Sequence, residues 1–453
     1  MIISFSVSNF LSIKEEQTLS FEATTESKYD EYFIREAGKY KLLKMGILYG
    51  ANASGKTNIL KALYILRQLV SKSRDADQEL DHTPFLFDPD YENDNCKMKL
   101  VFLIKEKDKY IKHIYAIEFN SKEIVYESLK FYPGQQPALI YERRKDEELE
   151  RGYSLAFGKD SKPKSEEQNI LESNTLRNNT ILSALNKVNL IIPNVRRVKR
   201  WFDDYISALF LPYSADQERD SDLFFHKSEN RKRVLSEFLR KADYNVTEFI
   251  FSDQKWQISL GKDYNAQMRN RLAHQTEIEI MEILSQYNEN LNQFKKGLVH
   301  NYTVNGKEEE RELSYTSESN GTKRSFELAA PLIDSLVSGK LVIIDEIESS
   351  LHFDLVKYII LVFLANSEDS QMLFTTHNLL LLDWEILRHD VIWFTEKKED
   401  GSTELYSLAD FNELNRSNIL KRYLSGQFGA KPDIYDYKLD LRAMKEESDG
   451  KKD

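Results

Sequence analysis

The sequence predicts an α/β fold with a mixed sheet, an antiparallel β-subdomain and an inserted helical subdomain. First, the buried-strand pattern "KMGILYG" runs directly into a glycine-containing loop and then into a helix with apolar periodicity. Second, three β-rich runs with short polar breaks lie between residues 97 and 132, as in an antiparallel meander. Third, three apolar β-runs follow residue 340, and a helical segment separates the first two, which is typical of parallel strands with crossover helices.

Length and composition restrict the class of protein. A chain of 453 residues can bury a sizeable core, and 25 Phe and 24 Tyr are too many aromatic residues for a disordered chain. The single cysteine, Cys96, excludes an internal disulfide and a Cys-rich zinc site. The first residues lack the features of a signal peptide. No continuous run of apolar residues approaches the length of about 18 that is needed to span a bilayer. We therefore expect a soluble, cytoplasmic protein with no membrane contact.

The order of these patterns predicts four regions. An N-terminal lobe, 1–165, carries the glycine loop and the meander, and a charged helical insertion covers 166–300. Helices are predicted within it over "NVRRVKRWFDDYISALF" (194–210), "RKRVLSEFLRKADYN" (231–245) and "RNRLAHQTEIEIMEILSQY" (269–287). A C-terminal lobe, 301–440, carries the later β-runs, and 441–453 form a polar tail. The net charge of −11 argues against a protein whose whole surface binds nucleic acid. A local basic face that binds nucleic acid remains an open alternative.

The glycine loop matches a phosphate-binding pattern in full. Its two glycines let successive backbone N–H groups face phosphate oxygens at a helix N-terminus, where negative charge is favoured. Lys56 is expected to hold the β and γ phosphates, and Thr57 to ligate Mg²⁺. The predicted contacts are Gly50, Asn52, Ala53, Ser54, Gly55, Lys56, Thr57 and Asn58. A simple strand-to-helix turn is the alternative, which the flanking strand and helix disfavour.

Two later strand ends supply the remaining chemistry. In "LVIIDEIESS", Asp345 ends a buried strand and is predicted to hold Mg²⁺, while Glu346 is predicted to act as general base on the attacking water. His377, in "LFTTHN", ends another apolar strand and is predicted to sense the γ-phosphate. Lys56, Glu346 and His377 thus form the predicted catalytic set. The alternatives are a polar strand terminus and a structural histidine.

A second polar turn, "SNGT", precedes an apolar-periodic helix upstream of the acidic strand. It is another helix N-terminus able to receive a phosphate. One nucleotide bound by one subunit has no use for two such sites. We therefore predict that Ser319, Gly321 and Thr322 contact the γ-phosphate of a nucleotide held by another copy of the chain. A plain helix cap at Ser319 remains an equal alternative.

The order of motifs resembles the ATP-binding-cassette (ABC) ATPase heads of the structural-maintenance-of-chromosomes (SMC), RecF and OLD-nuclease type. The four motifs are similar to Walker A, signature, Walker B with its D-loop, and switch histidine. More narrowly, the chain resembles bacterial OLD-related ATPases of the AAA type from phage-defence and abortive-infection systems. The segments that carry this likeness are "SNFLSI", "YGANASGKTNIL", "ESNGTKR", "DEIESSLH", "DVIWFTEKKEDGSTELYSLADF" and "YLSGQFGAKP".

The resemblance implies roles for individual residues. Lys56 and Thr57 correspond to the Walker A ligands, and Asp345 and Glu346 to the Walker B pair. His377 corresponds to the switch histidine, Ser319 and Gly321 to the trans-acting signature, and Ser350 to the D-loop residue at a dimer interface. Two features depart from the family pattern: Phe353 replaces the usual proline after "SLH", and no residue is identified as the Q-loop glutamine.

The implied function is that of an ATPase whose two copies sandwich two ATP molecules with Mg²⁺, with larger assemblies left open. Too few residues follow "TELYSLADF" for a Toprim nuclease domain. We therefore expect a sensor or scaffold subunit of an anti-phage system with a separately encoded effector, a nuclease being favoured.

Two alternatives stay open. A RecF-like DNA-repair ATPase would bind duplex ends through the basic clusters Arg196 to Arg200 and Arg231 to Arg233, although such clusters are more often solvated helix faces. An assembly platform would bind ATP with negligible turnover, against which the intact Glu346 argues.

Overall fold

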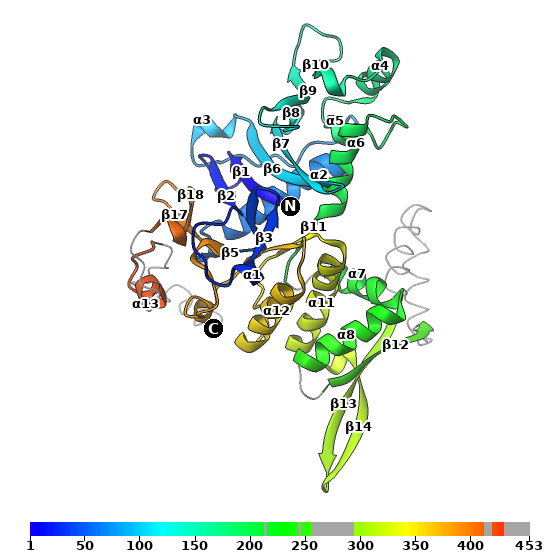
Figure 1. Ribbon diagram of the computed structural model, residues 1–453, viewed down its shortest axis with the longest axis vertical. Coiled ribbons are helices and arrows are strands. Elements are labelled where there is room, and N and C mark those ends of the chain that lie inside the picture. Colours follow the sequence, from blue (N-terminus) through cyan, green and yellow to red (C-terminus); the bar gives the residue numbers. More distant parts are fainter. Residues whose placement is uncertain (213–214, 243–245, 256–293, 412–418, 430–453) are drawn as a thin grey trace, which may run out of the picture.

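The computed structural model describes residues 1–212, 215–242, 246–255, 294–411 and 419–429 (Figure 1). Two sheets dominate it, one of seven strands and one of six. The helical run predicted at 269–287, the polar tail 441–453 and the end of the "YLSGQFGAKP" motif lie outside the described residues. Within the described ranges, no helix is both long and apolar enough to cross a bilayer.

The six-stranded core sheet has the order β11-β15-β16-β5-β17-β18. Neighbouring strands from β11 to β17 are parallel, and only β18 runs antiparallel, beside β17. β5, β15 and β16 are buried at every position, as expected for parallel strands covered on both faces. The predicted parallel strands are therefore confirmed. The strands are β5 (Met45–Gly50), β11 (Ile206–Phe210), β15 (Leu341–Ile344), β16 (Gln371–Thr375), β17 (Ile392–Lys397) and β18 (Thr403–Ser407).

This strand order brings the predicted motifs together. β16 lies between β5 and β15, so the strand before "THN" separates the glycine-loop strand from the acidic strand. Because these strands are parallel, their carboxyl ends meet at one edge of the sheet, where α/β folds bind ligands. The helix α2 (Lys56–Ser71) follows β5, α11 (Asn320–Ser338) precedes β15, and α12 (Phe353–Asn366) connects β15 to β16. α2 packs against β5 and β16 and also contacts β1 of the second sheet.

The second sheet has the order β10-β9-β8-β7-β6-β1-β2 and is antiparallel throughout. This confirms the predicted meander and adds the first two strands of the chain to it. The strands are β1 (Ile2–Ser8), β2 (Gln17–Ser20), β6 (Cys96–Glu106), β7 (Lys109–Phe119), β8 (Ile124–Phe131), β9 (Ala138–Lys145) and β10 (Tyr153–Phe157). The remaining short elements are a two-stranded sheet, β3 (Ile34–Ala37) and β4 (Tyr40–Leu43), and the helices α1 (Asp30–Phe33), α3 (Pro89–Glu92) and α13 (Ile419–Leu424), of which α13 stacks Tyr423 on Phe394 of β17.

The middle of the chain contains the expected helices but is not wholly helical. α4 (Ser165–Asn174), α5 (Ile181–Ala184), α6 (Pro193–Tyr205), α7 (Ala215–His226) and α8 (Glu229–Ala242) agree with the helical pattern. The expectation that "ISALF" continues a helix is wrong, because Ile206–Phe210 form β11 and pair with β15. At this edge of the core sheet, pairing with β15 and burial of Ile206 and Leu209 outweigh the local helical pattern.

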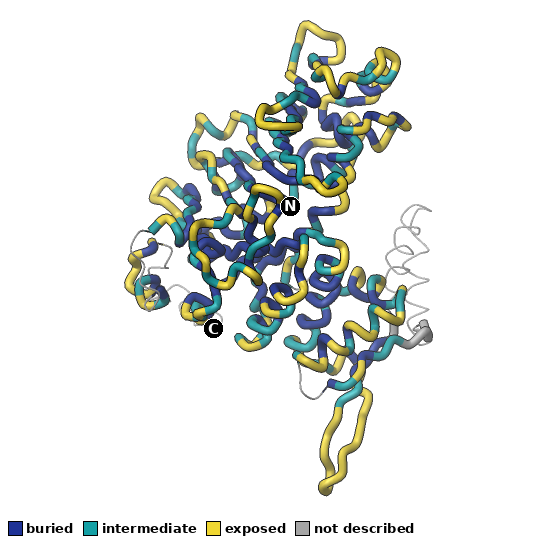
Figure 2. Tube along the Cα trace, viewed as in Figure 1, coloured by how far each residue is buried: buried dark blue, intermediate teal, exposed yellow. Residues whose placement is uncertain are grey.

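A second departure is a three-stranded antiparallel sheet, β12 (Val246–Lys255), β13 (Phe294–Val304) and β14 (Lys307–Ser314). The ribbon of β13 and β14 projects from the body of the molecule, and every residue of β14 is exposed (Figure 2). The predicted helical insertion 166–300 therefore contains strands as well as helices.

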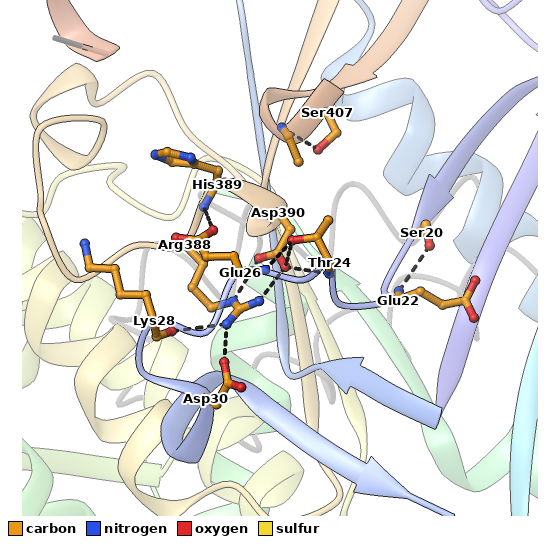
Figure 3. Close-up of polar contacts among 11 residues, drawn as sticks. Ser20, Glu22, Thr24, Glu26, Lys28, Asp30, Arg388, His389, Asp390 and Ser407 are labelled. Carbon is orange, nitrogen blue, oxygen red and sulfur yellow. Dashed lines mark hydrogen bonds and ion pairs between the residues drawn. The ribbon is translucent and has the colours of Figure 1, made fainter. Parts of the chain in front are cut away.

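A buried polar cluster joins the N-terminal segment to the region just before β17 (Figure 3). Arg388 is fully buried, forms an ion pair of 2.6 Å with Asp390 and contacts the Asp30 carboxylate. Asp390 also accepts hydrogen bonds of 2.9 Å from the backbone N–H and the hydroxyl of Thr24. The cluster thus holds residues 24–30 against residues 388–390, which lead into β17 of the parallel sheet.

Candidate functional site

The loop between β5 and α2 has the backbone that phosphate binding requires. A Cβ at Gly50 would lie 2.5 Å from the carbonyl oxygen of Thr395, so only glycine fits there. Gly55 has a φ of +105° and Ala53 a φ of +61°, both in the left-handed region. The loop leads directly into the first turn of α2, whose N–H groups and dipole favour an anion.

Hydroxyl groups from distant segments support this loop. The Ser54 hydroxyl lies 2.6 Å from that of Thr395 on β17, and Thr403 on β18 donates to the Ser54 carbonyl at 2.9 Å. Ser12 lies 2.6 Å from Thr403 and accepts a hydrogen bond of 2.7 Å from the Asn58 amide. Asn58, a predicted nucleotide contact, is thus directed toward Ser12 here. Ser12, Thr395 and Thr403 lie in segments that carry the family resemblance, but no role was predicted for them.

Lys56 lies inside the loop and is only 5% exposed. Its ammonium donates hydrogen bonds of 2.9 Å and 3.0 Å to the carbonyls of Gly50 and Ala51. Burial lowers the pKa of Lys56 to about 8, although Asp345 and Glu346 among the nearby carboxylates oppose the shift. The lysine is therefore poised to exchange two neutral carbonyls for phosphate oxygens.

The predicted metal ligands touch each other. The Thr57 hydroxyl lies 3.1 Å and 3.0 Å from the two carboxylate oxygens of Asp345. Asp345 also accepts a hydrogen bond of 2.6 Å from the hydroxyl of Thr375, at the end of β16. These donors are all oxygens, and Mg²⁺ usually takes one or two protein oxygens together with phosphate oxygens and water. The donor set therefore fits Mg²⁺ brought by a nucleotide, with Thr57 and Asp345 as its protein ligands.

Glu346 stands just beyond the strand end in an unusual conformation. Its φ of +47° is rare for a glutamate, and such strained residues cluster at functional sites. Its backbone N–H donates to the Thr375 hydroxyl at 2.7 Å, so Thr375 orients both members of the acidic pair. The side chain is half-buried beside the site. Thr375 was not predicted, although its place before His377 in "LFTTHN" was a usable signal.

His377 follows β16 as predicted, with an exposed side chain. Partial desolvation of the imidazole, and then repulsion from the Lys56 ammonium, lower the pKa of His377. Its backbone N–H donates to the carboxylate of Glu348, a residue that the sequence reasoning did not single out. The structure thus gathers Lys56, the acidic pair, Glu348 and His377 around one sheet edge.

The signature turn lies at the start of α11 and contacts Ser350 in the turn after β15. The Ser319 hydroxyl caps α11 by accepting a hydrogen bond of 3.1 Å from the Thr322 N–H, so Ser319 is a helix cap, as the alternative interpretation predicted. Gly321 is so close to the Ser350 carbonyl that a Cβ would lie 3.0 Å from it. The turn lines a pocket of about 490 Å³ together with His352 and neighbouring residues. Among the described residues, no hydrogen bond joins the turn to the phosphate loop of the same chain.

Most of the basic side chains considered for DNA contact are already engaged. Arg197 pairs with Glu106 at 2.5 Å, and Lys199 is buried and pairs with Asp203 at 2.5 Å. Arg196 donates to the carbonyl of Leu190. In the second cluster, the Arg231 guanidinium lies 4.1 Å from the Phe224 ring centroid and Lys232 pairs with Glu229. Arg200 and Arg233 remain exposed.

These features define a class of protein. A glycine loop between a parallel strand and a helix faces an Asp-Glu pair at a nearby strand end, which is the arrangement of P-loop, ATPase-type nucleotide-binding proteins. The family model described as "AAA domain, putative AbiEii toxin, Type IV TA system" matches residues 47–383, and the chain belongs to this family.

Solved structures give further, distant matches. The SMC head domain from Thermotoga maritima is 11% identical, with a TM-score of 0.39 over 90% of this chain and 98% of that chain. The SmcHead bound to the C-winged helix domain of ScpA is 13% identical, with a TM-score of 0.42 over 90% and 97%. The Smc head domain with an extended coiled coil, bound to the C-terminal domain of ScpA derived from Pyrococcus furiosus, is 13% identical, with a TM-score of 0.34 over 94% and 98%. The comparison with curated proteins found no match.

Proposed function

We propose that this protein binds Mg²⁺ and ATP and hydrolyses ATP to ADP and phosphate. The observation that carries the proposal is the direct contact between Thr57 and Asp345. These residues are far apart in sequence, and their contact places the acidic strand end at the mouth of the phosphate loop. Glu346 follows Asp345 directly, so a general base stands next to the metal position.

Each residue at the sheet edge has a distinct task. The loop N–H groups and the α2 N-terminus orient the phosphates, and Lys56 transfers its hydrogen bonds from loop carbonyls to phosphate oxygens. Thr57 and Asp345 would hold Mg²⁺, which would supply positive charge to neutralise the phosphates. Glu346 polarises the attacking water, and His377 contacts the γ-phosphate. Thr375 orients Asp345 and Glu346 through its two hydrogen bonds.

We further propose that the active form is a homodimer with two composite sites. In each site, Ser319, Gly321 and Thr322 of one subunit would meet the γ-phosphate held by the phosphate loop of the other. Two observations support this arrangement: the turn is surface-accessible at the start of a long helix, and its contacts within the chain lead to Ser350 rather than to the loop. ATP would join the subunits, and hydrolysis would loosen them.

At the level of biology, we propose a nucleotide-switched sensor or scaffold in a bacterial anti-phage system, acting with a separately encoded effector, a nuclease being favoured. The description of the family, a putative toxin of a toxin–antitoxin system, supports a role of this kind. The RecF-like alternative is weakened because most of its proposed DNA-contacting side chains are engaged within the chain. Co-purification with the product of an adjacent gene tests the effector; DNA binding without any partner protein would favour repair.

A phosphate-release assay tests the enzymatic proposal. We expect Mg²⁺-dependent turnover by the wild type and a loss of about 100-fold or more in Lys56→Ala, because the lysine stabilises charge on the transferred phosphate. Lys61→Ala is the matched control, since this lysine is exposed on the same helix and should leave turnover unchanged. Normal turnover by Lys56→Ala, or none by the wild type, would reject the proposal.

A further inference from the structure

Glu348 has an environment that its sequence position does not explain. It lies in the turn after β15, and one carboxylate oxygen accepts the backbone N–H of His377. Within the described part of the chain, its other oxygen, Oε2, is buried and has no hydrogen-bond partner. The carboxylate also interacts electrostatically with Lys56. Glu348 thus connects the acidic turn directly to the loop that carries the predicted γ-phosphate sensor.

A carboxylate placed for stability alone would look different. A buried acceptor without a partner destabilises a protein, because the hydrogen bonds it makes to water in the unfolded chain are not replaced. Glu127, buried in the antiparallel sheet, shows the stabilising arrangement: it accepts hydrogen bonds from Tyr115, Tyr141 and the backbone of Ile181. Among the residues that the structure describes, Glu348 has no comparable set of donors, although it lies beside the nucleotide site. Its half-satisfied state therefore indicates a functional role.

The turn that contains Glu348 also reaches the signature. Its backbone is tightly closed, because the N–H of Ser349 donates to Glu346 at 2.9 Å and that of Leu351 to Glu348 at 2.7 Å. Ser350 follows with a φ of +61°, and its carbonyl oxygen lies directly against Gly321. A shift of this turn therefore displaces the Ser350 carbonyl against the signature turn.

We infer that Glu348 is a positioning residue that couples the two nucleotide sites of the dimer. It ties the His377 loop, which contacts the γ-phosphate of its own site, to the Ser350 turn, which contacts the signature serving the other site. Movement of His377 on γ-phosphate binding or loss is thereby passed to Gly321. This inference rests on the proposed ATPase and its composite sites, and it adds a route by which one site affects the other.

The test compares Glu348→Ala with Glu348→Gln, because glutamine keeps an oxygen that can accept the His377 N–H. Steady-state turnover is measured against ATP concentration, and binding with a fluorescent ATP analogue. For the wild type we expect a Hill coefficient above 1. Glu348→Ala should lower kcat roughly 10- to 100-fold, as loss of a supporting contact does, and bring the Hill coefficient to 1 with little change in affinity. Glu348→Gln should restore most of both properties.

Two further variants sharpen the result. Glu385→Ala removes an exposed acid from the segment between β16 and β17 and should behave as wild type. Gly321→Ala places a methyl group against the Ser350 carbonyl and should abolish cooperativity by disturbing the contact between the two turns. This variant replaces Glu348→Ala in the test if Glu348→Ala does not fold. A Hill coefficient in Glu348→Ala equal to that of the wild type would overturn the inference. If Glu348→Ala does not fold, an unchanged Hill coefficient in Gly321→Ala would do the same. A Glu348→Gln variant as impaired as Glu348→Ala would also overturn it. A wild type without turnover would instead reject the proposed function on which the inference rests.

Discussion

At the scale of single residues, Lys56 shows how the site is prepared for phosphate. Its ammonium is buried against two carbonyl oxygens, and this burial lowers its pKa to about 8. A bound triphosphate favours the charged form and raises that pKa again. Nucleotide binding must therefore take up a proton whenever the pH exceeds about 8.

This coupling predicts a pH dependence of ATP affinity. Below pH 8 Lys56 is already charged and the Kd should be constant; above it, affinity should fall by up to about tenfold per pH unit, because each binding event takes up one proton. Fluorescence titration between pH 7 and 9.5 measures the effect. Lys56→Arg stays charged over this range and should give a flat profile. A flat profile for the wild type would contradict the burial of a titrating lysine.

The sequence could identify the residues that lie in continuous motifs but not their partners. Lys56 and Asp345 stand in strings whose spacing reflects a known chemistry, and the structure brings Asp345 into contact with Thr57 of the loop. Thr375 and Glu348 were not assigned, because their contacts depend on β16 lying between β5 and β15, although the place of Thr375 before His377 was a usable signal. Ser12 contacts Thr403, nearly the whole chain away in sequence, which no local pattern reveals.

At the scale of elements, the strand pattern was predicted where periodicity is strong. The meander and the parallel strands after residue 340 have apolar runs of strand length bounded by polar breaks. β11 was missed because "ISALF" continues an amphipathic helix, α6, and only pairing with β15 makes it a strand. β14 is exposed at every position and almost entirely polar, so it carries little hydrophobic signal.

The Arg388 cluster yields a prediction about stability. Arg388→Met should lower the free energy of unfolding by about 3–5 kcal/mol, because Asp390 would remain buried without its ion-pair partner. Urea unfolding followed by circular dichroism measures the change. The double variant Arg388→Met, Asp390→Asn removes the uncompensated charge and should regain part of the loss. If the single and double variants were equally destabilised, the ion pair would not be the source of the effect.

At the scale of the whole molecule, no hydrogen bond among the described residues joins the two halves of the predicted site. The phosphate loop and the acidic strand end meet at the edge of the core sheet, whereas the signature turn contacts Ser350 and lines a different pocket. The opposite faces of one ATP would thus be met by two copies of the chain. The central claim is that ATP joins two subunits and that its hydrolysis separates them.

The most direct test is the mass of Glu346→Gln in saturating Mg²⁺ and ATP, measured by size-exclusion chromatography with light scattering. Glutamine cannot act as the general base, so we expect ATP to bind without turnover and the variant to elute as a stable dimer. With ADP it should elute as a monomer, and adding Ser319→Arg should prevent the dimer by blocking the composite site. A Glu346→Gln variant that stays monomeric in saturating ATP, or that hydrolyses ATP at the wild-type rate, would contradict the claim.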